Sequence, residues 1–390
     1  MSLRVLLWTV AALAVLAVLA LGAVGWVLAG RVVVPQPYGL APEFELGRVT
    51  DLTGGRYGVE LPGGAAPAQH ANARAAGAYL LLWEGGHGAL REVLADDGAT
   101  VTRAVELREG APPAAGLKGR IDNFYYRHDP ATDLGIAYEE LRLDGPVGGL
   151  RAWYLPAEQG TAVLLLHGRR RGELIETLRF AKALNELGLP VLALAYRNHD
   201  ASDPSPDGLY HYGASEWQDA LVGALELARR GHGRLILYGL SMGGAVALEA
   251  LERWPAPAPE VVGLVLDSPL VSPSDVVEVG AVKAGLPFPG ALTRLALFVA
   301  GLRTGVDFAG LEQARTAGGI GVPVLLVAGE EDSTVPVGAV DAFAREVRTP
   351  LTYLRLPGVE HVEAWNHDPA RYAGWLRAFV ASLEVRAAAP

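Results

Sequence analysis

The sequence predicts an α/β fold in which a mainly parallel sheet is covered by helices on both faces. From Asp133 onward, short apolar runs alternate with longer segments of amphipathic, helical periodicity. Repeated strand–helix units of this kind build parallel sheets, with ligands bound at the carboxyl ends of the strands. Residues 44–129 show a different pattern, in which short β-like runs are separated by Gly and Pro clusters.

Composition limits the classes of function. The 390 residues carry a formal net charge of −10, and no basic run is long enough to indicate binding to nucleic acid. The chain has no cysteine, which excludes disulfides, cysteine catalysis and Cys-ligated zinc. We expect no metal and no cofactor.

The first segment, residues 1–31, is predicted to be a transmembrane anchor. Residues 5–30 form a run of 26 residues without a charge, and as a helix this run would be about 39 Å long. Trp8 and Trp26 lie near its two ends, where interfacial aromatic residues belong. A cleavable signal peptide is the alternative, but the run exceeds the roughly 7–15 apolar residues that are usual there. The flanking charges favour a globular part outside the cytoplasm.

Residues 32–130 are predicted to form a linker and a small β-rich accessory domain. Three prolines between positions 32 and 42 indicate the linker. Beyond it, β-like runs occur at residues 57–61, 78–84 and 101–107. No convergent spacing of acids, bases or metal ligands occurs in this region, so its role stays open.

The α/β domain is predicted to occupy residues 131–386. Its strands are expected at 137–143, 150–155, 162–166, 191–196, 235–238, 261–266, 322–327 and 352–356. Residues 269–321 interrupt the alternation with apolar helical segments, and we expect them to form a lid.

The centre of this domain is the G-x-S-x-G sequence Gly239-Leu240-Ser241-Met242-Gly243, between an apolar run and a helical segment. A sharp strand-to-helix turn requires glycine at both flanking positions, because a β-carbon would clash there. The turn exposes the Ser241 hydroxyl at a helix N-terminus, whose free N–H groups favour developing negative charge. A glycine-rich turn whose serine only caps the helix is the alternative.

A serine hydroxyl becomes a nucleophile when a histidine, held by a carboxylate, takes its proton. Asp332 follows the predicted strand at 322–327, and His361 follows the one at 352–356. The three residues Ser241, Asp332 and His361 are therefore predicted to form a catalytic triad. Other positions that could supply the acid or the histidine are Asp267, Glu330, Glu331 and His367.

The oxyanion of such a reaction needs two N–H donors. The Met242 N–H is one, and the loop His167-Gly168-Arg169 supplies the other, which we assign to the Arg169 backbone N–H. His167 is interpreted as a structural histidine that bonds the loop backbone.

Arg169, Arg170 and Arg171 form an unusual triple. Their guanidinium groups could hold an anionic part of a substrate. Pairing with Glu173 and Glu176 is the alternative.

The chain resembles the α/β-hydrolase superfamily in the stretches LLLHGRRRGE, YGLSMGGA, LVAGEEDSTVP and GVEHVEAW, over roughly residues 133–383. It looks closest to the branch of serine aminopeptidase-like and acyl-ester hydrolases. The resemblance implies that Ser241 is the nucleophile, Asp332 the acid and His361 the base, with Met242 and Arg169 as oxyanion donors. Residues 32–130 match no family.

These observations together predict a membrane-anchored serine hydrolase. An ester or thioester is favoured over an amide by analogy, because an anchored enzyme with an apolar lid readily meets acyl chains. A peptidase or acyltransferase with the same triad, or a binding protein of the same fold without catalysis, is the alternative.

Overall fold

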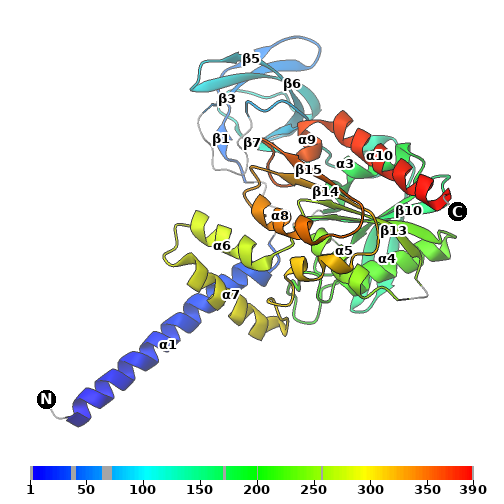
Figure 1. The fold of residues 1–390 in the computed structure, drawn as a ribbon. Coiled ribbons are helices and arrows are strands. Elements are labelled where there is room, and N and C mark those ends of the chain that lie inside the picture. The colour runs from blue at the N-terminus through cyan, green and yellow to red at the C-terminus, as the bar shows by residue number, and fades with distance from the viewer. Residues whose placement is uncertain are drawn as a thin grey trace.

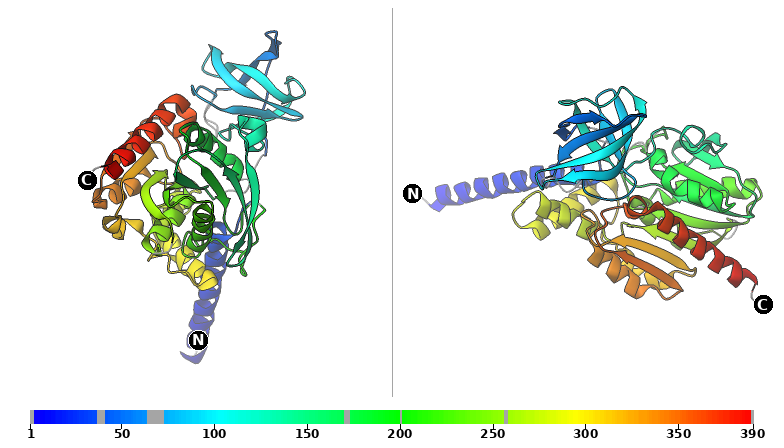
Figure 2. Two further views of the ribbon diagram at one scale, coloured as in Figure 1. Left: turned by 90° about the vertical axis from the view of Figure 1, so that its right-hand side faces the viewer. Right: turned by 90° about the horizontal axis from the view of Figure 1, so that it is seen from above.

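The computed structural model describes residues 3–36, 41–63, 73–169, 173–199, 201–255 and 258–388, which form a helix and two sheets with their covering helices (Figure 1). Helix α1 (Leu3–Val33) extends away from the body of the molecule. A small sheet and a large sheet follow it along the chain, and both views in Figure 2 show them as separate layers.

The small sheet is antiparallel throughout, with the order β1-β7-β4-β5-β6-β3-β2 in the described residues. Its strands are β1 (Phe44–Glu45), β2 (Val49–Asp51), β3 (Arg56–Pro62), β4 (Leu80–Trp83), β5 (Gly86–Asp96), β6 (Thr100–Gly110) and β7 (Lys118–Asp122). Leu61, Leu81 and Val105 are fully buried in its own hydrophobic core. Strands β3, β4 and β6 lie at the predicted β-like runs, whereas β5 was not predicted.

The large sheet has the order β15-β14-β13-β12-β10-β11-β9-β8 in the described part of the chain. The six strands β10 to β15 are parallel to one another. Strand β9 is antiparallel to both of its neighbours, β11 and β8. Its strands are β8 (Glu139–Gly145), β9 (Gly148–Leu155), β10 (Thr161–Leu166), β11 (Val191–Ala195), β12 (Arg234–Leu240), β13 (Glu260–Asp267), β14 (Val324–Gly329) and β15 (Leu351–Leu356).

Helices cover both faces of the large sheet because its central strands are apolar on both faces. Along β10, Val163 and Leu165 pack into one core, while Leu164 and Leu166 pack into another. The first core contains side chains of α3 (Glu173–Glu186) and α10 (Pro369–Ala388). The second contains side chains of α4 (Trp217–Arg229), α5 (Met242–Glu252) and α8 (Val337–Glu346).

Residues between β13 and β14 form the helical insertion expected as a lid. It contains α6 (Pro273–Lys283), α7 (Pro289–Thr304) and two short 3₁₀ turns, Gln313–Arg315 and Ala317–Gly319. The remaining helices are α2 (Pro130–Leu134) and α9 (Ala364–His367). Helix α7 lies beside the C-terminal half of α1 (Figures 1 and 2), and a β-carbon on Gly25 would come within 2.9 Å of Val299.

Within the described residues, no helix combines the length and the apolar character needed to span a bilayer. The transmembrane anchor predicted for residues 1–31 is therefore not supported.

The predicted linker starts too early in the sequence. Val32 and Val33 are buried in the core of the large sheet's domain. The Tyr212 hydroxyl donates to the Val32 carbonyl at 2.6 Å, and the Tyr210 N–H donates to the Val33 carbonyl at 2.8 Å. The end of α1 is thus part of the folded domain.

The first turn of α5 packs directly against the end of β10. A β-carbon on Gly243 would overlap the carbonyl oxygens of Leu166 and His167, which are backbone atoms that cannot move aside. We therefore expect Gly243→Ala to lower the free energy of unfolding by about 2 kcal/mol or more. Denaturant unfolding followed by circular dichroism measures this change.

Gly338→Ala is the matched control, because Gly338 also lies in the first turn of a helix but has open space around it. This substitution should raise stability by about 0.5–1 kcal/mol through the helix preference of alanine. Equal effects at the two positions would contradict the packing argument.

Candidate active site

Ser241 occupies the sharp turn between β12 and α5. Its backbone angles, φ 48° and ψ −114°, are strained for a residue with a side chain. The turn is possible because its neighbours lack side chains: a β-carbon on Gly239 would overlap the Gly243 carbonyl. The predicted elbow is therefore present, with the serine at the N-terminus of α5.

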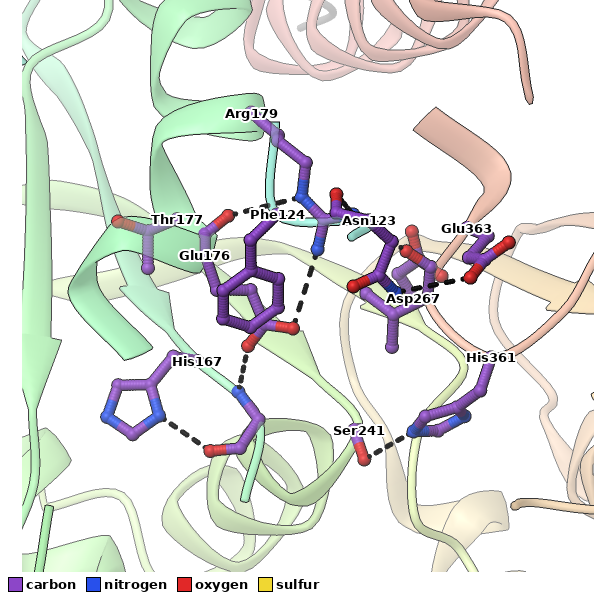
Figure 3. A network of polar contacts seen from close by, with 12 residues as sticks. Asn123, Phe124, His167, Glu176, Thr177, Arg179, Ser241, Asp267, His361 and Glu363 are labelled. Carbon is purple, nitrogen blue, oxygen red and sulfur yellow. Dashed lines mark hydrogen bonds and ion pairs between the residues drawn. The ribbon is translucent and has the colours of Figure 1, made fainter. Parts of the chain in front are cut away.

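The structure brings Ser241, His361 and Asp332 together. His361 Nε2 lies 2.8 Å from Ser241 Oγ (Figure 3), and His361 Nδ1 lies 2.7 Å from Asp332 Oδ2. A carboxylate can only accept, so the ring carries its proton on Nδ1. Nε2 is then free to accept the serine proton, which is the arrangement that activates a hydroxyl.

Backbone contacts orient the acid and the histidine. Asp332 follows β14, and its Oδ1 accepts the N–H groups of Thr334 and Val335 at 2.9 and 2.7 Å. This leaves Oδ2 directed at His361. The N–H of His361 donates to Glu360 Oε2 at 2.9 Å, which fixes the loop after β15.

The other acids considered have different partners. Asp267 is fully buried and accepts hydrogen bonds from the Tyr372 hydroxyl at 2.7 Å and the Ser268 hydroxyl at 3.2 Å. Burial raises the pKa of Asp267 to about 6. Glu330 forms an ion pair with Arg355 at 2.8 Å. Asp332 is therefore the carboxylate that the fold presents to the histidine.

The loop after β10 is held from several sides. The Gly168 N–H donates to Glu176 Oε2 at 2.8 Å (Figure 3). The Tyr196 hydroxyl lies 3.1 Å from the Gly168 carbonyl, and the Tyr210 hydroxyl donates to the Arg169 carbonyl at 2.8 Å. In a trans peptide the N–H points opposite to the C=O, so the Arg169 N–H points away from Tyr196. Because the Gly168 N–H is engaged, the Arg169 N–H is the next donor in this loop.

His167 has the structural role that the sequence indicated. It is fully buried, and its Nδ1–H donates to the Gly168 carbonyl at 2.6 Å. Its ring stacks on Tyr196 with 4.3 Å between the ring centroids. Burial lowers the pKa of His167 well below its ordinary value, which keeps the ring neutral.

Of the arginine triple, the structure describes Arg169, whose side chain has partners that neither interpretation named. The Arg169 side chain donates to the Arg31 carbonyl at 2.6 Å and lies over the rings of Tyr210 and Tyr212. Glu176 does not pair with it, since its carboxylate binds the Gly168 N–H and the Arg179 guanidinium. Arg170 and Arg171 lie outside the described residues.

The arrangement can support nucleophilic attack by an alcohol with a histidine as the proton acceptor. The oxygen of Ser241 lies at one end of a hydrogen-bonded chain, and a helix N-terminus lies next to it. Among the residues that the structure describes, no group of three His, Asp or Glu side chains is placed to hold a metal ion.

Comparisons with known proteins agree with this geometry. An uncharacterised protein of Mycobacterium tuberculosis, found in strains H37Rv and CDC 1551, is 33% identical over 221 residues, covering 54% of this chain and 68% of the relative. A family model described as serine aminopeptidase, S33, matches residues 157–307. The chain belongs to the α/β-hydrolase superfamily.

Solved structures show the same fold. An esterase of Pyrococcus furiosus matches this α/β hydrolase with a TM-score of 0.54 and 21% identity, covering 66% of this chain and 94% of the esterase. The family model includes Ser241 and the loop after β10, whereas Asp332 and His361 lie beyond its match.

A buried arginine of this α/β hydrolase links the candidate site to the small sheet (Figure 3). The Arg179 guanidinium contacts Glu176 Oε1 at 3.4 Å, the Val362 carbonyl at 3.1 Å and the Asn123 carbonyl at 3.4 Å, and also bonds Asn366 Oδ1. Asn123 follows β7, and Val362 follows His361. The arginine therefore fastens the loops of the site to the end of the small sheet, a role that no motif in the sequence indicated.

Glu363 lies in the same interface. Its carboxylate accepts hydrogen bonds from the Tyr79 hydroxyl at 2.9 Å and the Asn123 amide at 3.2 Å. Burial nevertheless raises the pKa of the Glu363 carboxyl to about 7, because the desolvation of a charge outweighs these two bonds. The small sheet and the loop after β15 thus meet at a carboxyl that is readily protonated.

This carboxyl makes stability depend on pH. An unfolded glutamate titrates near 4.5, so between this value and about 7 the folded protein retains a proton that the unfolded chain releases. The retained proton adds about 3 kcal/mol to the free energy of unfolding. This stabilisation is complete below the unfolded pKa of 4.5 and is lost as the pH rises through the folded pKa of about 7. We expect Glu363→Gln to remove this part of the dependence of the free energy of unfolding on pH. Urea unfolding below pH 4.5 and above pH 7 measures the change.

Asp267 lowers stability with rising pH in the same way between pH 3.8 and about 6, and this contribution is present in the wild type and in Glu363→Gln. Glu346→Gln, an exposed residue at the end of α8, is the control and should leave the wild-type slope intact. An unchanged slope in Glu363→Gln would show that this carboxyl is ionised throughout.

Proposed function

We propose that this α/β hydrolase is a serine hydrolase that cleaves an ester or thioester through an acyl-enzyme on Ser241. The contact of 2.8 Å between His361 Nε2 and Ser241 Oγ carries the proposal, because it places a base on the hydroxyl. Asp332, at 2.7 Å from the other ring nitrogen, favours the tautomer that this base needs.

The reaction follows from these positions. Ser241 Oγ attacks the substrate carbonyl while His361 Nε2 takes its proton, and Asp332 stabilises the imidazolium that forms. The N–H groups of Met242 and Arg169 hold the oxyanion. His361 then gives its proton to the leaving alcohol or thiol. Water attacks the acyl-enzyme by the same route, which restores the free serine.

An aminopeptidase is the second candidate, because the matching family model carries that description. Such an enzyme needs a free carboxylate near the serine to bind the substrate's ammonium group. Among the described residues, the nearby carboxylates Asp332, Glu176, Asp267 and Glu360 each accept hydrogen bonds within the protein. This favours an uncharged acyl substrate.

We also propose that the protein associates with a membrane through α1. Exposed apolar side chains occur on α1 and on or beside the adjoining lid helices. These helices lie at one end of the molecule (Figure 1). The exposed side chains include Leu7, Trp8, Leu16, Trp26, Phe288, Phe298 and Leu302. So many large apolar side chains exposed on neighbouring helices suit a lipid surface. The orientation expected from the flanking charges, with the globular part outside the cytoplasm, stays a prediction.

The nucleophile can be tested with a fluorophosphonate probe, which labels only an activated serine. We expect wild-type protein to be labelled and Ser241→Ala not to be. Asp332→Asn should lower the rate of p-nitrophenyl ester hydrolysis by roughly four orders of magnitude, because the histidine would adopt the wrong tautomer. A change at Ser382, on α10 and far from the site, should leave labelling intact.

Turnover of aminoacyl anilides but not of esters would favour the peptidase. Product partitioning towards an added alcohol would indicate an acyltransferase. A folded wild-type protein that neither labels nor hydrolyses would point to a binding protein without catalysis.

Membrane association can be tested by flotation with phosphatidylcholine–phosphatidylglycerol vesicles. The double change Trp8→Glu and Leu16→Glu places two charges on the exposed surface of α1 and should reduce the floated fraction several-fold. Val93→Glu with Leu94→Glu is the matched control, since these exposed apolar residues lie on β5 of the small sheet. Equal flotation of both variants would contradict a role for α1.

A further inference from the structure

A cavity of about 180 Å³ lies where α1 meets the lid helices α6 and α7. Leu28 and Val32 of α1, Ala281 of α6 and Leu292 of α7 contribute to its mainly apolar wall. Arg169 and Tyr212 of the large domain complete it among the described residues. Three separate parts of the chain thus enclose one apolar space.

The loop after β10 contacts both the cavity and the candidate nucleophile. Arg169 lines the cavity, and it directly follows Gly168. A β-carbon on Gly168 would lie 3.5 Å from Cβ of Ser241, so this loop passes directly over the serine. A substrate carbonyl held by the Arg169 N–H would therefore be bound by a residue that also lines the cavity.

The wall that α1 supplies is fixed to the domain. The last turn of α1 accepts hydrogen bonds at three successive carbonyls, Arg31, Val32 and Val33, from Arg169, Tyr212 and the Tyr210 backbone. One turn earlier, the Arg303 guanidinium lies 4.2 Å from the centre of the Trp26 ring. These contacts hold Leu28 at the cavity.

We propose that the C-terminal turns of α1 form one wall of the acyl-binding site, and that this site takes the acyl chain of a short ester of about six carbons. The proposal rests on the serine hydrolase function above. The cavity of about 180 Å³ sets the size of the ligand. An apolar cavity of about 150 Å³ in another protein binds benzene, a molecule of six carbons. Arg31 and Arg169 are the charged residues that line the cavity, and the Arg169 guanidinium is bonded to α1; most of the other lining residues are apolar.

The wall is tested by two neighbouring residues of α1 that differ in where they point. Leu28 lines the cavity, whereas Val27 is 60% exposed and does not contribute to it. Leu28→Trp should fill the space and lower kcat/KM for p-nitrophenyl hexanoate about tenfold or more, while leaving the acetate ester nearly unchanged. Val27→Trp adds a comparable side chain outside the cavity and should keep the wild-type profile.

A substitution that enlarges the cavity shows whether the effect of Leu28→Trp comes from filling the space or from misfolding. Leu28→Ala enlarges the space, so the preferred chain should lengthen towards octanoate, while Val27→Ala should not shift it. Fluorophosphonate labelling of all four variants reports the nucleophile independently of the cavity. A wild-type profile in both Leu28 variants, or equal hydrolysis of acetate and dodecanoate esters by wild type, would overturn the proposal.

Failure of the underlying function would look different. Wild-type protein that neither labels nor hydrolyses any ester would overturn the serine hydrolase function, and this inference with it. Normal labelling together with a chain-length preference that neither Leu28 substitution changes would overturn only the role of α1.

Discussion

The close approach of α5 to the end of β10 is the constraint on which the candidate site depends. Because Gly243 has no side chain, the first turn of α5 can lie against the carbonyls of Leu166 and His167. This contact brings the serine at the start of α5 next to the loop that follows β10. The parallel order of the sheet then delivers Asp332 and His361 from neighbouring strand ends to the same edge. A larger residue at 243 would separate the nucleophile from its oxyanion loop.

Burial of the Arg179 guanidinium explains why the small sheet is attached where it is. A buried charge is costly unless every donor has an acceptor. Arg179 finds its acceptors in Glu176, Val362 and Asn366 of the large domain and in the Asn123 carbonyl at the end of the small sheet. The same guanidinium therefore joins the oxyanion loop, through Glu176, to the histidine loop, through Val362. Through this one side chain, the end of the small sheet is in contact with both loops.

The sequence was sufficient for the elements that depend on local pattern. The elbow at Ser241 and the positions of Asp332 and His361 follow from apolar runs and the residues after them. Arg179 could not be found in this way, because its partners at positions 123 and 362 are 56 and 183 residues away and are backbone carbonyls. Hydropathy also could not predict at which residue α1 becomes buried in the folded domain. Val32 is apolar whether it faces lipid or packs in a core, and only tertiary contacts decide between them.

Arg169 couples the N-terminal helix to the chemistry. Its backbone belongs to the loop proposed to bind the oxyanion, and its guanidinium caps the carbonyl of Arg31 at the C-terminus of α1, where the helix dipole favours a cation. Tyr210 strengthens the link, because its hydroxyl holds the Arg169 carbonyl while its N–H holds the Val33 carbonyl. Displacing α1 would remove acceptors from both residues and free the loop that carries the donor. The helix is therefore better described as a part of the site than as a tether that happens to precede it.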